Sequence, residues 1–155
     1  MIVTNTTYQA APWADVLYAM DRKWWDTYLP DVRERFGGER VSRAKLVHRY
    51  GVTHLETFRH YNNSGAAAIS LAAHRGASTV ILLGYDCQYT DGKRHWHGDH
   101  PRGLGNAGSI DKWKRGFDEL AAALENAGVL VLNASRETAL TCWQRVDLDE
   151  ALAVG

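Results

Sequence analysis

The sequence predicts an α/β fold built on a mostly parallel sheet, and two features of the chain carry that prediction. Apolar runs of strand length alternate with helical patterns, which is typical of parallel strands joined by helices. Residues 78–84 and 128–133 are nearly continuous apolar runs, as expected for strands buried on both faces. At 155 residues the chain has the size of one domain. We therefore expect a single Rossmann-like domain over residues 1–155, with helices on both faces of the sheet.

Two strands are expected near the start of the chain. Residues 2–5 form a short apolar run that ends at Asn5, and residues 14–20 form a second run followed by Asp21. Each of these strands is expected to place a polar side chain at its carboxyl end.

The next segment predicts a short helix and then an excursion. Residues 22–29 contain two tryptophans and a tyrosine and are expected to form an aromatic helix that ends before Pro30. Residues 31–43 are rich in charge, and we expect them to lie exposed outside the sheet.

The second half of the chain shows the clearest alternation. A helix of small residues is expected over 66–75 because Gly76 supplies a helix stop. The strand at 78–84, a polar loop at 85–107 and a helix at 109–126 lead to the strand at 128–133. The acidic residues 147–150 are expected to start a last short helix.

Polar residues collect where ligands bind in parallel sheets, beyond the carboxyl ends of the strands. The candidate ligand contacts at strand ends are Asn5, Asp21, Gly84, Asp86, Tyr89 and Asn133. Asn63, Ser64 and Gly65 stand at a helix N-terminus, where free N–H groups favour an anion such as phosphate. Each polar residue also has a purely structural interpretation, as a helix cap or a turn former.

A histidine-rich stretch stands out in the long loop, with His95, His97 and His100 beside Asp99. Its letters match a zinc-ligand motif of the metallo-β-lactamase superfamily, in which imidazoles and a carboxylate hold metal. No histidine follows His100, however, so the downstream ligands of that superfamily are missing from the sequence. We therefore favour a metal-free catalytic or binding loop, in which Trp96 either anchors the loop or lies over a base or sugar ring.

Bulk composition restricts the classes of partner. Eighteen basic and eighteen acidic residues give a net charge of zero, so no strong nucleic-acid signal is present. The apolar runs are far shorter than a membrane span. The first residues lack the basic start and the long apolar stretch of a signal peptide, so we expect none. With Cys87 and Cys142 as the only cysteines, we expect free thiols and a cytoplasmic location. Aromatic residues beside the charged excursion favour a homodimer.

The order of six motifs resembles that of a group of phage proteins. This group is distantly similar to bacterial lipooligosaccharide sialyltransferases and to archaeal hydroxymethylpterin pyrophosphokinase-like proteins. The motifs are Val3-Thr4-Asn5, Val16-Leu17-Tyr18-Ala19-Met20-Asp21, Asn63-Ser64-Gly65, Ile81-Leu82-Leu83-Gly84-Tyr85-Asp86, His95-Trp96-His97-Gly98-Asp99 and Val131-Leu132-Asn133-Ala134-Ser135.

The resemblance implies a nucleotide-sugar donor held by positions such as Asn5 and Asp21. It places a catalytic base at the position of Asp99, with His100 beside it in the sequence. Relatives in this group commonly start with a strand and a Gly-x-Gly-Pro-Ser turn, so the resemblance implies that this chain lacks the family's first strand.

Three functions follow as hypotheses. The first is a phage-derived, nucleotide-dependent transferase of the glycosyltransferase-like kind, which acts on a small-molecule or glycan substrate without an essential metal. His100, supported by Asp99, serves there as the general base, and His95, His97 and Tyr89 assist the leaving phosphate. The second is a binding protein for a nucleotide or small ligand without turnover. The third is a metal-dependent hydrolase that uses the histidine-rich stretch.

Overall fold

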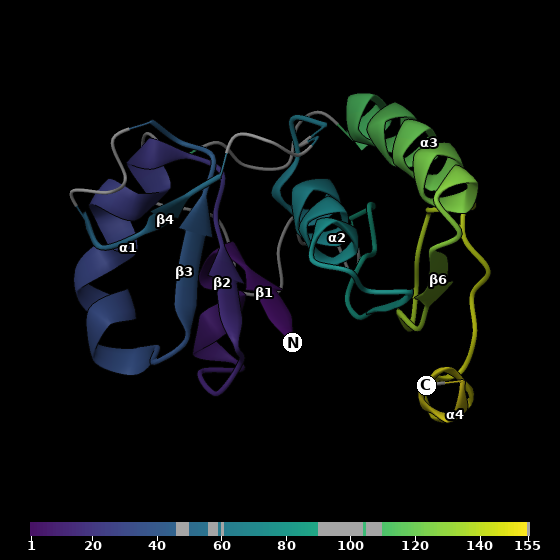
Figure 1. The fold of residues 1–155 in the computed structure, drawn as a ribbon, viewed down its shortest axis with the longest axis horizontal. Coiled ribbons are helices and arrows are strands. Elements are labelled where there is room, and N and C mark those ends of the chain that lie inside the picture. The colour runs from purple at the N-terminus through teal and green to yellow at the C-terminus, as the bar shows by residue number, and fades with distance from the viewer. Residues whose placement is uncertain (46–49, 56–58, 60, 90–103, 105–109, 155) are drawn as a thin grey trace. The chain divides into compact units, whose positions relative to one another are not determined.

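The computed structural model describes residues 1–45, 50–55, 59, 61–89, 104 and 110–154. It shows a mixed α/β protein with parallel strands, as the sequence predicts (Figure 1). Its elements, in chain order, are β1 (Ile2–Thr4), the 3₁₀ helix η1 (Asn5–Gln9), β2 (Val16–Tyr18), α1 (Arg22–Arg35), β3 (Glu39–Ser42), β4 (Thr53–His54), α2 (Ser64–His74), β5 (Thr79–Leu82), α3 (Ile110–Asn126), β6 (Leu130–Asn133) and α4 (Leu148–Ala153).

The chain falls into two compact units. The first holds the described residues of Met1–Ala68 together with Leu104, and the second holds the described residues from Ile69 to Val154. The division lies within α2. The expectation of a single domain over residues 1–155 stays a prediction.

The first unit contains a four-stranded parallel sheet in the order β1-β2-β3-β4. Val3 lies opposite Leu17, Leu17 opposite Arg40, and Ser42 opposite His54. The sequence predicts β1 and β2, although β2 is shorter than the expected run of residues 14–20. It misses β3 and β4 altogether.

The expectation of an exposed excursion over residues 31–43 is wrong. Helix α1 continues through Pro30 to Arg35, and β3 follows directly. Trp25, Leu29 and Val32 recur at helical spacing and are all buried, so the apolar stripe of the helix extends past the proline. Pro30 is on the exposed side of the helix, where the loss of its N–H is cheaper because water can hydrogen-bond to the vacant carbonyl.

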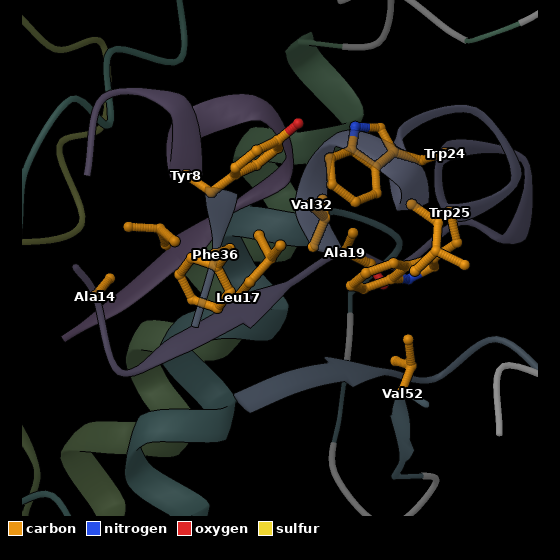
Figure 2. Close-up of a cluster of buried hydrophobic side chains, with 11 residues drawn as sticks. Tyr8, Ala14, Leu17, Ala19, Trp24, Trp25, Val32, Phe36 and Val52 are labelled. Carbon is orange, nitrogen blue, oxygen red and sulfur yellow. The ribbon is translucent and has the colours of Figure 1, made fainter. Parts of the chain in front are cut away.

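Aromatic side chains dominate the core of the first unit, which α1, η1 and the strands build together (Figure 2). The ring of Trp24 packs edge-on against Tyr8, with ring centroids 6.1 Å apart, and stacks on Tyr28 at 5.0 Å. Trp25 is fully buried, and its Nε1 donates a hydrogen bond of 3.0 Å to the backbone oxygen of Ala19. Each indole therefore fixes the position of α1 against the carboxyl end of β2 or against η1.

Gly38 permits the tight turn from α1 into β3. A Cβ atom at this position would lie 2.5 Å from the backbone oxygens of Ala14 and Asp15, and 2.8 Å from the ring of Phe36. Glu39 begins β3 with a hydrogen bond of 2.8 Å from its N–H to the oxygen of Asp15. Only glycine leaves room for the chain to approach the start of β2 so closely.

The second unit confirms the predicted pair of strands. β5 and β6 are adjacent and parallel, with Val80 opposite Val131 and Leu82 opposite Asn133, and α3 connects them in the chain. Figure 1 shows α3 running beside β6. The predicted burial on both faces is incomplete, because Leu82 is buried while Leu130 is 45% exposed.

Two further helices agree with their sequence signals. Asn63 caps α2, since its Oδ1 accepts a hydrogen bond of 3.0 Å from the N–H of Ala66. Asp147 caps α4 in the same way by accepting a bond of 2.9 Å from the N–H of Asp149. None of the helices within the described part of the chain combines the length and apolar character that a membrane span requires.

Candidate ligand-binding site

The carboxyl ends of the four strands in the first unit form one edge of the sheet, because all four strands run parallel. Each strand delivers a polar or charged residue there. Asn5 follows β1, Asp21 lies three residues beyond β2, Arg43 follows β3, and His54 ends β4. We call this set of four residues the carboxyl edge. It is the candidate site because ligands of open parallel sheets bind at such edges.

Asn5 stands at the point where β1 turns into η1. Its φ of 48° lies in the left-handed region, which asparagine tolerates better than most residues. The side chain is half-buried, so it remains partly accessible at the edge. The position of Asn5 agrees with the predicted strand end.

Asp21 is the N-cap residue of α1, but its side chain makes no capping hydrogen bond. Its backbone oxygen instead accepts the N–H groups of Trp24 and Trp25, at 3.1 and 3.3 Å. The carboxylate is exposed beside the positive end of the helix dipole. Its position is therefore compatible with a ligand contact as well as with a helix start.

The hydroxyl group of Tyr18 is affected by the charged residues that follow β2 and β3. Tyr18 is fully buried, and burial raises the pKa of its hydroxyl above the ordinary value of 10.0. The positive charge of Arg43 acts in the opposite direction, and the negative charge of Asp21 adds to the rise. Both charged groups are thus within electrostatic reach of the same phenol, although they come from different strands.

Hydrogen bonds hold the exits of β3 and β4 in place. The buried Ser42 accepts a bond of 3.0 Å from the N–H of Ala44, and its backbone oxygen accepts the N–H of Leu55 at 2.9 Å. His54 Nε2 lies 3.1 Å from the backbone oxygen of Arg43. Because a carbonyl oxygen only accepts, Nε2 of His54 must carry a proton here.

Sequence reasoning identified Asn5 and Asp21 but missed Arg43 and His54. Neither residue follows an apolar run of strand length, because β4 contains only two residues and β3 begins with Glu-Arg. The available signal was the pair Val41-Ser42, a short apolar-to-polar transition like that at Val3-Thr4.

Asn63, Ser64 and Gly65 open α2 within the first unit. The hydrogen bond from Ala66 engages the side-chain oxygen of Asn63, which accounts for this residue as a helix cap. Ser64 and Gly65 form the first turn, where a ligand contact stays a prediction.

The other predicted contacts within the described residues belong to the second unit, and Asn133 has a clear structural role there. Its side chain is fully buried. Oδ1 accepts the N–H of Ser135 at 3.1 Å, and Nδ2 donates to Oγ1 of Thr138 at 3.2 Å. Thr138 in turn donates to the backbone oxygen of Tyr85 at 2.7 Å. Asn133 therefore joins the ends of β5 and β6 rather than presenting a polar group to solvent.

The loop after β5 is held by the same network. Ser135 Oγ accepts the N–H of Tyr85 at 2.8 Å, and the backbone oxygen of Asp86 accepts the N–H of Ala139 at 2.8 Å. Gly84 has a φ of 71° and is exposed, and Tyr89 is 50% exposed. Gly84 and Tyr89 are thus accessible, whereas Asp86 is half-buried.

Cys87 lies in this loop, at a φ of 48°. Burial raises the pKa of its thiol, and burial likewise raises the pKa of Cys142 to about 11. Both cysteines are free thiols. A nucleophile needs the thiolate form, so these shifts argue against a catalytic cysteine at either position.

The catalytic candidates His95, His97, Asp99 and His100, together with Trp96, lie outside the described residues. Within the described ranges, no group of three or more His, Cys, Asp or Glu side chains is arranged to hold a metal ion. Comparison of the chain with family models, with curated proteins and with solved structures found no match.

Proposed function

We propose that the chain is a nucleotide-dependent transferase of the glycosyltransferase-like kind, with a Rossmann-like arrangement of strands. The observation that carries the proposal is the carboxyl edge, where four parallel strands in succession deliver Asn5, Asp21, Arg43 and His54. A nucleotide offers groups that match these residues: hydroxyl groups and base edges for the amide and the carboxylate, and phosphate for the N–H donors of arginine and histidine.

In this proposal Asn5 and Asp21 hold the donor, and the start of α2 supplies further N–H groups. The histidine-rich stretch supplies the chemistry. His100, supported by Asp99, removes the proton from an acceptor hydroxyl, while His95 and His97 assist the leaving phosphate. A phage origin and a small-molecule or glycan acceptor are part of the same proposal.

Binding of a nucleotide is tested first, by a thermal-shift screen of nucleotides and nucleotide sugars followed by calorimetry. A ligand that binds only the folded state raises the apparent melting temperature. Asp21→Ala should weaken the binding of a hit by roughly 1–3 kcal/mol through loss of a charged hydrogen bond. Asp118→Ala, on the exposed face of α3 in the second unit, is the matched control and should bind with unchanged affinity.

A binding protein without turnover is the second candidate, because the same carboxyl edge holds a nucleotide equally well without any chemistry. His100→Ala separates the two functions. A transferase retains donor affinity in this variant and loses about 10²–10⁴-fold in rate, because a general base acts in the transition state. Binding that weakens in His100→Ala, with no donor breakdown detected in the parent chain, assigns the loop to recognition and rejects the transferase.

A further inference from the structure

Basic side chains gather at one edge of the four-stranded sheet, whereas at the opposite edge the N-terminal ammonium of Met1 pairs with Asp15. Asp15 precedes β2 and Glu39 begins β3, so both carboxylates lie at the edge formed by the amino ends of the strands. The chain leaving β3 at the other edge carries Arg43 and Lys45, and β4 ends there with His54. Because β3 and β4 are parallel, the residues that follow them lie at the same edge of the sheet. Arg43 and Lys45 there outnumber the carboxylate of Asp21, although the whole chain has a net charge of zero.

Arg43 and His54 are tied together at that edge. His54 is exposed and its Nε2 lies 3.1 Å from the backbone oxygen of Arg43, while Arg43 is half-buried. Ser42, opposite His54 in the register, is fully buried and fixes the turn into Ala44. The side chains of Arg43 and His54 are therefore carried by neighbouring backbone segments that pair in the sheet.

Asp21 is the carboxylate of the same edge, and its place in the strand order limits where an anion can bind. It follows β2, whereas His54 ends β4, two strands away. Neighbouring strands lie about 4.8 Å apart, so the end of β4 is about 10 Å from the end of β2. The repulsion between Asp21 and an anion is therefore weaker at the end of β4 than at the ends of β1 and β3, which neighbour β2.

We propose that Arg43 and His54 form an anion subsite for an oxyanion, phosphate or carboxylate, at the carboxyl ends of β3 and β4. This inference rests on the proposed function, since it assigns the charged part of the donor to this side of the edge. The planar guanidinium group of Arg43 matches two oxygens of such an anion, and the imidazole of His54 offers a further donor when protonated.

The test uses the full chain and two simple anions. Sodium phosphate and sodium acetate are titrated at constant ionic strength, with sodium chloride as the reference salt, and the imidazole signals of His54 are followed by NMR after assignment with His54→Gln. We expect a saturable shift with phosphate, acetate or both, and the stronger of the two identifies the oxyanion. Arg43→Gln should weaken this binding roughly ten- to a hundredfold, as expected for a hydrogen bond to a charged group.

Two further variants control for loss of charge and of structure. Arg115→Gln removes an exposed arginine from α3 in the second unit and should leave the affinity within about twofold of the parent value. Arg43→Lys keeps the charge without the planar fork, so a folded Arg43→Lys protein with intermediate affinity supports the subsite. Shifts of His54 no larger than those caused by chloride, or an unchanged affinity in folded Arg43→Gln, overturn it.

The outcomes for the subsite and for the proposed function are distinguishable. Binding of phosphate at His54 without binding of any nucleotide supports the subsite and rejects the nucleotide-dependent transferase. A nucleotide that binds as tightly to Arg43→Gln as to the parent chain supports the proposed function and rejects the subsite.

Discussion

The buried hydroxyl group of Tyr8, on η1, donates a hydrogen bond to the carboxylate of Asp31 on α1. Gln9 Nε2 lies 3.4 Å from Oδ2 of Asp31, and Arg35 Nε lies 2.8 Å from Oδ1. This contact joins the segment that follows β1 to the middle of a helix more than twenty residues later. It therefore helps to place Asn5, at the start of η1, relative to the helix that begins after Asp21.

Replacement of this hydroxyl is expected to destabilise the chain. Tyr8→Phe keeps the ring contacts with Trp24 and Phe36 but removes the donor to Asp31, and the free energy of unfolding should fall by about 1–2 kcal/mol. Urea unfolding followed by tryptophan fluorescence measures the change. Tyr50→Phe is the matched control, because Tyr50 also donates to a carboxylate, at 2.5 Å from Asp26, but in an exposed position. A loss in Tyr50→Phe as large as that in Tyr8→Phe would show that burial does not matter.

The same pair predicts how stability depends on pH. The hydrogen bond from Tyr8, more than any other group, lowers the pKa of Asp31 below 3.8, so its stabilisation is present above this value and is lost as pH falls through the lower folded pKa. Burial and, after it, the hydrogen bond to Asp31 raise the pKa of Tyr8 above 10.0. The contribution of Tyr8 to stability is therefore complete below pH 10.0 and is lost as pH rises through the higher folded pKa.

Urea titrations from about pH 2 to 11 should therefore show a plateau between roughly pH 5 and 9, with stability falling on both sides. Tyr8→Phe should show a smaller acid fall, since its Asp31 lacks the largest cause of the lowered pKa. Parallel curves for the two proteins below pH 4 would contradict the assignment of the acid fall to this pair.

The sequence predicts the fold where local and tertiary signals agree. Residues 78–84 and 128–133 are apolar runs that begin or end at glycine, and the structure confirms them as β5 and β6. The prediction of an exposed excursion over residues 31–43 fails for a physical reason. Pro30 and the surrounding charges suggest that the helix stops, but the energy gained by burying Trp25, Leu29 and Val32 on one face outweighs the local cost.

The sequence likewise predicts only part of the candidate site. Asn5 and Asp21 follow strands that their own sequence reveals, whereas the positions of Arg43 and His54 depend on pairing. Two residues of β4 gain strand geometry only by bonding to Val41 and Ser42 of β3. Asn133 shows the opposite case, because its strand-end position was evident but its burial depends on Ser135 and Thr138, which fold back over it.

Gly38 gives a prediction with an internal control. Gly38→Ala should lower the free energy of unfolding by about 1–3 kcal/mol, because its Cβ would meet two backbone oxygens that belong to the start of β2. The neighbouring Gly37→Ala has no atom within 4 Å of the added Cβ, and its stability should change by less than about 0.5 kcal/mol or should increase. Thermal and urea unfolding of both variants measure the difference, and equal losses would remove the steric explanation.

The last prediction concerns the role of Asn133. Asn133→Ala removes the buried acceptor of the Ser135 N–H and one of the donors to the hydroxyl of Thr138, which keeps its bond to Tyr85. It should lower the free energy of unfolding by about 2–4 kcal/mol, because two hydrogen bonds of a buried side chain are lost. Asn126→Ala, at the exposed end of α3, is the control and should change stability by less than about 0.5 kcal/mol. Once a nucleotide ligand is found, folded Asn133→Ala should bind it with nearly unchanged affinity at low temperature, because the side chain contacts the protein and not solvent. Full stability combined with lost ligand binding would instead return Asn133 to the ligand site.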